Sequence, residues 1–155
     1  MANTRESTEI IVKAVPGFAP AWQDFLREWE KVNPPPLYLA MGELAHYIVD
    51  AYVRGNTAEF VELFAAIEVA LQEENTELHI LLSVGLFEDI QNISSHRTFD
   101  SKSFRHWLGR ESLRAWDQVE LACGKSRQGQ QNEDHDGGSF GDGRNALVTK
   151  EHCRR

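Results

Sequence analysis

The sequence predicts an all-α fold, a compact bundle of about five helices joined in short antiparallel hairpins and followed by a disordered C-terminal tail. Apolar residues recur at helical spacing in five successive segments, and only the stretch from Ile10 to Val15 alternates with a period of two. The length of 155 residues suits one ordinary domain. We therefore expect an all-α domain at residues 6–122 and a tail at residues 123–155.

The chain begins with a weakly patterned stretch, residues 6–15, that fits either a short helix or an extended lead-in. Pro16 and Gly17 end this stretch in either case. A firmer helix is expected at residues 19–32, where large apolar side chains share one face: Trp22, Phe25, Leu26 and Trp29. The three prolines at 34–36 break that helix.

Two further helices are expected at residues 37–54 and at about 56–74. Gly55 ends the first, because glycine suits the residue after a helix C-cap. Asn56 is a natural N-cap for the second, with Glu59 three positions on. Apolar side chains at helical spacing mark the buried faces: Met41, Leu44, Ala45, Ile48 and Tyr52, then Phe60, Leu63, Phe64, Ile67 and Leu71.

A fourth helix, capped by Asn75, is apolar on nearly all sides from Leu78 to Ile90. Neighbours are expected to cover it on several sides, which makes it the central helix. Asp100 is expected to cap a fifth helix at residues 101–122, which forms an outer wall. Asn-Thr pairs at 56–57 and 75–76 leave a short helical-repeat arrangement open as an alternative.

The composition changes after Gly124 to a segment rich in Gly, Gln, Asn and Asp without apolar periodicity. Such a segment buries too little apolar surface to offset its ordering entropy. Leu147 and Val148 are the only plausible docking point within it.

The folded part is acidic. The formal net charge of the chain is −8, and residues 1–122 hold 10 basic against 19 acidic side chains. This charge repels phosphate, so nucleic acid and anionic membrane are disfavoured as partners of the domain as a whole. A protein partner with a basic surface is the better electrostatic match.

Neither a signal peptide nor a membrane span is predicted. The two cysteines, Cys123 and Cys153, lie at or beyond the end of the last apolar pattern, so no disulfide framework organises the core. We expect a cytoplasmic protein.

Catalytic and metal-binding patterns are sparse. Glu43 and His46 form the Glu-x-x-His half-motif of di-iron bundles, but no second copy exists, and an ordinary polar face is the favoured interpretation. No nucleophile elbow or metal-ligand spacing is present, so no catalytic residue, metal or cofactor is assigned. Residues 96–114 carry five Lys or Arg against two acids, which suggests either a phosphate-binding strip or a solvated face paired with acidic neighbours.

Glu88 and Asp89 are expected in the final turns of the fourth helix, where the negative helix end disfavours acids by roughly 0.3–1 kcal/mol each. One interpretation is that Arg97 or Arg105 folds back to pair with them. The other is that they present an acidic, hydrogen-bonding edge to a basic partner. The candidate partner-binding residues are Glu88, Asp89, Gln91 and Asn92.

Residues 42–92 resemble a family of uncharacterised bacterial all-helical domains of unknown function. The resemblance is carried by three stretches: Gly42 to Ala45, Phe64 to Glu68, and Val84 to Asn92. It implies a helical fold and a bacterial cytoplasmic setting, with no established activity. Small acidic helical proteins of this kind also occur as toxin-neutralising immunity proteins, which is a link by analogy.

The function expected from these features is non-enzymatic binding of a protein partner, with an inhibitor or immunity-type protein as one form of it. Two alternatives stay open. One is a small metal-dependent or hydrolytic enzyme that uses Glu43, His46 and acids from the central helix. The other is a nucleic-acid or regulatory module that acts through residues 96–114.

Overall fold

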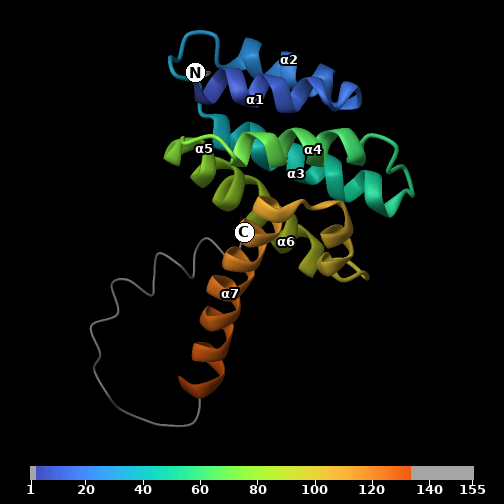
Figure 1. Cartoon of the computed structure of the whole chain (residues 1–155), viewed down its shortest axis with the longest axis vertical. Coiled ribbons are helices and arrows are strands. Elements are labelled where there is room, and N and C mark those ends of the chain that lie inside the picture. Colours follow the sequence, from blue (N-terminus) through green and yellow to red (C-terminus); the bar gives the residue numbers. More distant parts are fainter. Residues whose placement is uncertain (1–2, 134–155) are drawn as a thin grey trace.

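The computed structural model describes residues 3–133, and every regular element in this range is a helix (Figure 1). Among them η1 and η3 are 3-10 helices and η2 is a π-helix. The elements in chain order are α1 (Thr4–Lys13), η1 (Pro16–Phe18), α2 (Ala19–Glu28), α3 (Leu37–Val53), α4 (Phe60–Leu71), α5 (Thr76–Ile80), η2 (Leu81–Phe87), α6 (Glu88–Ser95), η3 (Ser101–Trp107) and α7 (Arg110–Glu133). The predicted all-α class is confirmed.

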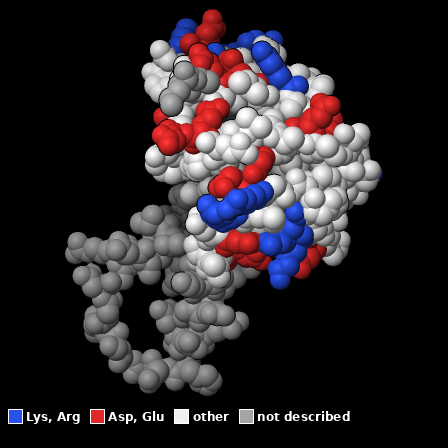
Figure 2. Space-filling view, viewed as in Figure 1, with Lys and Arg blue, Asp and Glu red and all other residues white. Residues whose placement is uncertain are grey.

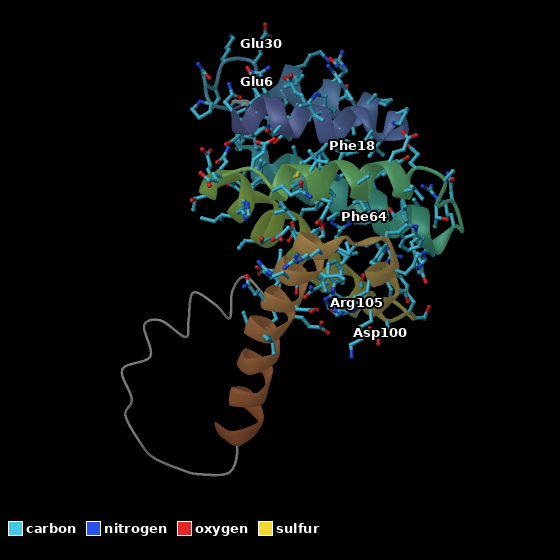
Figure 3. The ribbon with its side chains drawn as sticks, viewed as in Figure 1. Glu6, Phe18, Glu30, Phe64, Asp100 and Arg105 are labelled. Atoms are coloured by element: carbon cyan, nitrogen blue, oxygen red, sulfur yellow. The ribbon has the colours of Figure 1, made fainter. Side chains whose placement is uncertain are left out.

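The helices stack in layers. Figure 1 shows α1 and α2 at the top, α3 and α4 in the middle, and α6 with α7 below them. Phe18 lies between the first two layers and contacts the ring of Tyr47, while Phe64 lies nearer the lower layer and stacks on Trp107 (Figure 3). Aromatic side chains that we expected in the core therefore fill space between the layers.

The weakly patterned stretch at residues 6–15 is a helix. Asn3 and Glu6 form a reciprocal capping box, in which the Asn3 side chain accepts from the Glu6 N–H and the Glu6 carboxylate accepts from the Asn3 N–H. The next helix, α2, ends at Glu28, earlier than the predicted residue 32.

Gly55 ends α3 as predicted, with φ at 76°. Its N–H donates to the carbonyl of Tyr52, and the N–H of Asn56 donates to that of Ala51, which is the double hydrogen bond of a Schellman motif. The expectation that Asn56 caps the next helix was wrong. Asn56 is used to close α3, and α4 begins at Phe60 without a side-chain cap.

Glu59 joins three parts of the chain instead of serving a capping box. Its carboxylate accepts a 2.6 Å hydrogen bond from the Tyr47 hydroxyl and a 3.0 Å bond from the Gly17 N–H. Burial, together with this hydrogen bond and the nearby negative charge, raises the pKa of Tyr47 to about 12. A Cβ at Gly17 would lie 2.0 Å from the Tyr47 hydroxyl oxygen, so glycine is needed for this close approach.

The fourth predicted helix is helical without interruption from Thr76 to Ser95, as α5, η2 and α6, and so extends beyond the expected Ile90. Asn75 caps it as predicted, accepting from the Leu78 N–H at 3.1 Å. Since Asn75 is a cap and Asn56 is not, the two Asn-Thr pairs do not mark a structural repeat. The middle of this long helix packs against α3 and α7.

The fifth predicted helix is two elements. Asp100 caps η3, accepting from the Lys102 N–H, but Leu108 has extended backbone and a new helix, α7, begins at Arg110. Glu68 of α4 lies at this break. Its carboxylate accepts the Glu111 N–H, the Ser112 N–H and the Ser112 hydroxyl at 2.7–2.8 Å. It therefore caps α7 from another helix.

The pKa of Glu68 reflects this position. Burial on its own would raise it, but the hydrogen bonds from the Ser112 hydroxyl and from the two backbone N–H groups outweigh burial and hold the pKa below its usual value. A Cβ at Gly109 would lie 2.5 Å from the Glu68 carboxyl carbon. The glycine at the break thus leaves room for the carboxylate.

The last helix continues past residue 122 to Glu133, whereas we expected the tail to begin at residue 123. Residues 134–155, which hold most of the predicted tail, lie outside the described residues. No helix within residues 3–133 is long and apolar enough to cross a membrane.

Leu82→Ala and Leu86→Ala should each lower the free energy of unfolding by about 2–5 kcal/mol, because both side chains are fully buried in the long helix. Ile80→Ala is the matched control, since Ile80 is exposed on the same helix and its truncation should cost less than about 1 kcal/mol. Urea unfolding followed by circular dichroism measures all three. If both leucine variants lost less than about 1 kcal/mol of unfolding free energy, the long helix would not be the central helix.

Glu68→Gln should lower the free energy of unfolding by about 1–2 kcal/mol at pH 7, because it weakens the cap of α7. Since the folded pKa of Glu68 lies below the unfolded value, the stabilisation by the carboxylate is present above the unfolded pKa and is lost as the pH falls through the folded one. The difference in unfolding free energy between wild type and Glu68→Gln should therefore become smaller as the pH is lowered from 7 to 3. Glu62→Gln, exposed on the same helix, is the control. An unchanged difference at pH 3 would contradict this role.

Candidate functional site

A groove of about 660 Å³ lies between the beginning of α3 and the long helix α5, η2 and α6. This volume falls within the range of roughly 300–1,000 Å³ that is typical of ligand sites. The proline segment before α3 and Thr4 of α1 complete its lining. The groove is therefore built by three segments that are distant in the sequence.

The π-helix η2 supplies one wall of the groove through Leu81, Val84 and Gly85. A Cβ added to Gly85 would lie 3.6 Å from the Cβ of Met41, an ordinary van der Waals distance, so α3 lies beside this helix without a contact that requires glycine. π-helical turns occur frequently at functional sites. The same π-helix also borders a smaller pocket of about 440 Å³ on the side of α7, through Ser83 and Val84.

The groove carries exposed apolar side chains from both walls. Tyr38 and Leu39 at the beginning of α3 are 61 % and 40 % exposed, and Ile80 and Val84 on the long helix are 57 % and 37 % exposed. We expected neighbours to cover the long helix on several sides. The structure instead leaves this side of it open, and a contiguous exposed apolar surface of this kind is typical of binding sites.

The charged groups of the groove are acidic. Glu77, Glu88 and Asp89 line it, and the described residues of its lining include no Lys or Arg. Glu88 is 7 % exposed, whereas Asp89 is partly exposed. An apolar surface with carboxylates favours a ligand that combines apolar groups with positive charge.

The four candidate partner-binding residues do not form one edge. Glu88 and Asp89 line the groove, but Gln91 and Asn92 line a second pocket of about 450 Å³ on another side of α6. Asn92 is buried, and Gln91 donates to the backbone carbonyl of Trp116 at 3.2 Å. The helix also continues to Ser95, so the two acids lie at the beginning of α6, about two turns before the end of the long helix.

The arginines expected near these acids pair elsewhere. Arg97 forms an ion pair with Asp50 at 3.0 Å, and Arg105 forms one with Asp117. The hydrogen bond to Asp117 and its charge raise the pKa of Arg105.

The basic stretch at residues 96–114 is interspersed with acids. Besides the two pairs just described, Arg114 lies 3.5 Å from Glu111. Figure 2 shows blue and red side chains side by side on the lower part of the visible face, where η3 and the beginning of α7 lie in Figure 1. This arrangement matches the interpretation of a solvated face paired with acidic neighbours.

Glu43 and His46 are both exposed on α3, and only His46 lines the groove. Within residues 3–133 no group of three or more His, Cys, Asp or Glu side chains is placed to hold a metal ion.

The apolar residues of the groove were missed as site residues. Ile80 and Val84 belong to the nearly continuous apolar surface of the fourth helix, which we assigned to the core, and Tyr38 and Leu39 lie outside the buried face predicted for residues 37–54. The prolines at 34–36 were identified as a helix break but not as part of a site.

A family model for a domain of unknown function (DUF7674) matches residues 8–123. No curated protein and no solved structure matches the chain.

Glu88→Lys should lower the free energy of unfolding by at least about 2 kcal/mol, because it forces a longer side chain of opposite charge into a buried position. Asp89→Lys should cost clearly less, since Asp89 is partly exposed. Thermal and urea unfolding of the two single variants provide the comparison. Equal costs would mean that both residues belong to a solvated helix surface.

Proposed function

The chain belongs to the DUF7674 family, a domain of unknown function, and we propose that it is a non-enzymatic domain that binds a protein partner in the groove between α3 and the long helix. The observation that carries this proposal is the combination of exposed apolar side chains on both walls of the groove with carboxylates beside them. Partner-binding surfaces combine an apolar centre with a polar rim in this way.

The proposed partner presents a segment with apolar anchors and basic flanking residues. Tyr38, Leu39, Ile80 and Val84 offer contact surface for the anchors, and Glu77 and Asp89 offer charge for the flanks. An amphipathic helix or an extended segment laid along the groove would use these groups. The formal net charge of −8 would also speed the encounter with a basic partner.

An inhibitor or immunity-type protein is the more specific form of this proposal. Such a protein acts by occupying a surface on its target, which requires affinity and no catalytic group. We also propose the cytoplasm of a bacterial cell as its setting, supported by the family resemblance of residues 42–92.

Selection of peptides from a random display library on the full chain tests the proposal. We expect enrichment of sequences that combine two or more large apolar residues with Lys or Arg. Fluorescence polarisation of the selected peptides should give affinities that weaken with rising salt, because part of the attraction is electrostatic.

Ile80→Asp should weaken binding of the selected peptides at least tenfold, because a charge replaces an apolar anchor in the groove. Val61→Asp is the matched control, since Val61 is an exposed apolar residue on α4 outside the groove lining. It should bind the peptides as the wild type does. Peptides that bind both variants equally, or a selection without enrichment, would contradict the proposal.

A further inference from the structure

Ile80 and Val84 border two hollows at once. Both residues line the groove between α3 and the long helix, and both also line the α7 pocket, the hollow of about 440 Å³ between the long helix and the beginning of α7. Their side chains are 57 % and 37 % exposed. Ile80 and Val84 therefore form the crest of a ridge that separates the groove from the α7 pocket.

The α7 pocket is a furrow between two helices. The long helix lines it with a stripe from Thr76 to Val84, and α7 lines it with a stripe from Glu111 to Gln118. In both stripes the lining residues follow the spacing i, i+3, i+4, i+7, which places them on one face of each helix. At 1.5 Å per residue the stripes are about 10–12 Å long, which is about two turns of a partner helix.

The two hollows carry opposite charges at their edges. Glu77 lines the groove, whereas Arg114 lines the α7 pocket and is 58 % exposed. Arg114 lies 3.5 Å from Glu111, a longer contact than the 3.0 Å between Arg97 and Asp50. A guanidinium has five N–H donors in a planar fork that matches a carboxylate, and the contact with Glu111 involves one nitrogen of this fork. Arg114 can therefore bind a second carboxylate.

We propose that the protein partner clasps the ridge with two helices, one in the groove with basic residues on its flank and one in the α7 pocket with a carboxylate that pairs with Arg114. Apolar side chains of both helices pack against Ile80 and Val84 from opposite sides. This inference rests on the proposed function of the groove. It adds Arg114 as a residue that selects the partner.

Contact on both sides of the ridge fits the size and anatomy of protein interfaces. Specific protein–protein interfaces bury about 800 Å² on each partner. A segment laid in the groove alone covers Ile80 from one side and leaves its other side in water. Two helices cover the crest completely and place Ile80 and Val84 at the desolvated centre of the contact, where the residues that contribute most to affinity lie.

Arg114 also gives the contact an orientation. The formal net charge of −8 attracts basic segments whatever their pattern. A partner with basic residues on both sides of the ridge would meet Arg114 with a like charge, which disfavours it. The opposite charges of Glu77 and Arg114 thus determine which helix of the partner lies beside α3 and which lies beside α7.

The test uses the full chain as bait and a display library of three-helix miniproteins as the probe. The randomised residues of the library lie on one face of two adjacent helices, so that this face can meet both hollows. We expect binders with Lys or Arg on one of the two helices and Asp or Glu on the other. Their affinities are measured by biolayer interferometry.

Arg114→Glu should weaken binding of the selected miniproteins about tenfold or more, because their carboxylate then meets a like charge. Arg27→Glu is the matched control, since Arg27 also pairs with an acid three positions earlier in its helix but is not among the described residues that line either hollow. It should bind as the wild type does. Exchanging the carboxylate of the miniprotein for Lys should restore binding to Arg114→Glu, a rescue that a loss of folding would not permit.

Tyr38→Asp separates this inference from the proposed function, because Tyr38 lines the groove and is not in the described lining of the α7 pocket. If Tyr38→Asp weakens binding and Arg114→Glu does not, the partner occupies the groove alone and only this inference fails. It also fails alone if the Lys exchange gives no rescue, if Arg27→Glu weakens binding equally, or if library peptides are enriched and miniproteins are not. If only Arg114→Glu weakens binding, or neither library is enriched, the inference and the proposed function both fail.

Discussion

The contact between α3 and the long helix that follows α4 is the packing interaction on which the rest of the structure depends. Leu82 and Leu86 are fully buried, and Met41 of α3 lies beside Gly85 of the long helix. The opposite side of the long helix packs against α7. Two faces of an apolar helix are thereby covered, and the third, with Ile80 and Val84, remains open. The groove exists because the long helix is apolar on more sides than its neighbouring helices cover.

Polar contacts between distant segments fix how the other helices meet this pair. Glu59 ties the turn at Gly17 to Tyr47 of α3, and Glu68 holds the first turn of α7. Each carboxylate satisfies backbone N–H groups that a helix end or a turn would otherwise leave unpaired. These are stronger constraints than the exposed ion pairs of Arg97 and Arg105, whose side chains are substantially solvated.

Local signals in the sequence predicted much of the fold, because they depend on residues close together in the chain. Helical spacing identified the buried faces of α3 and α4, and Gly55 and Asn75 acted at the helix ends where they were expected. The division of the last helix could not be predicted, because Glu68 caps it from a separate helix. The open side of the long helix was hidden for a similar reason, since spacing shows that a residue is apolar but not which neighbour covers it. Glu88 and Asp89 were identified from charge alone, and the structure places them in the groove but away from Gln91 and Asn92.

The π-helical turn η2 absorbs one residue of chain length without changing which side of the long helix faces the core. Its hydrogen bonds join residues five apart, so this stretch takes up more residues per turn than the 3.6 of an α-helix. Removing one residue between Leu81 and Phe87 would convert the π-helical turn into an α-helical one, and the side chains of α6 would keep nearly the same direction around the axis. Ile90 would stay in the core, and Asp89 would stay on the wall it shares with Val84. The same deletion in α5 or α6 would instead turn every later side chain by about 100°, so η2 is the part of the long helix in which a change of length disturbs the groove least.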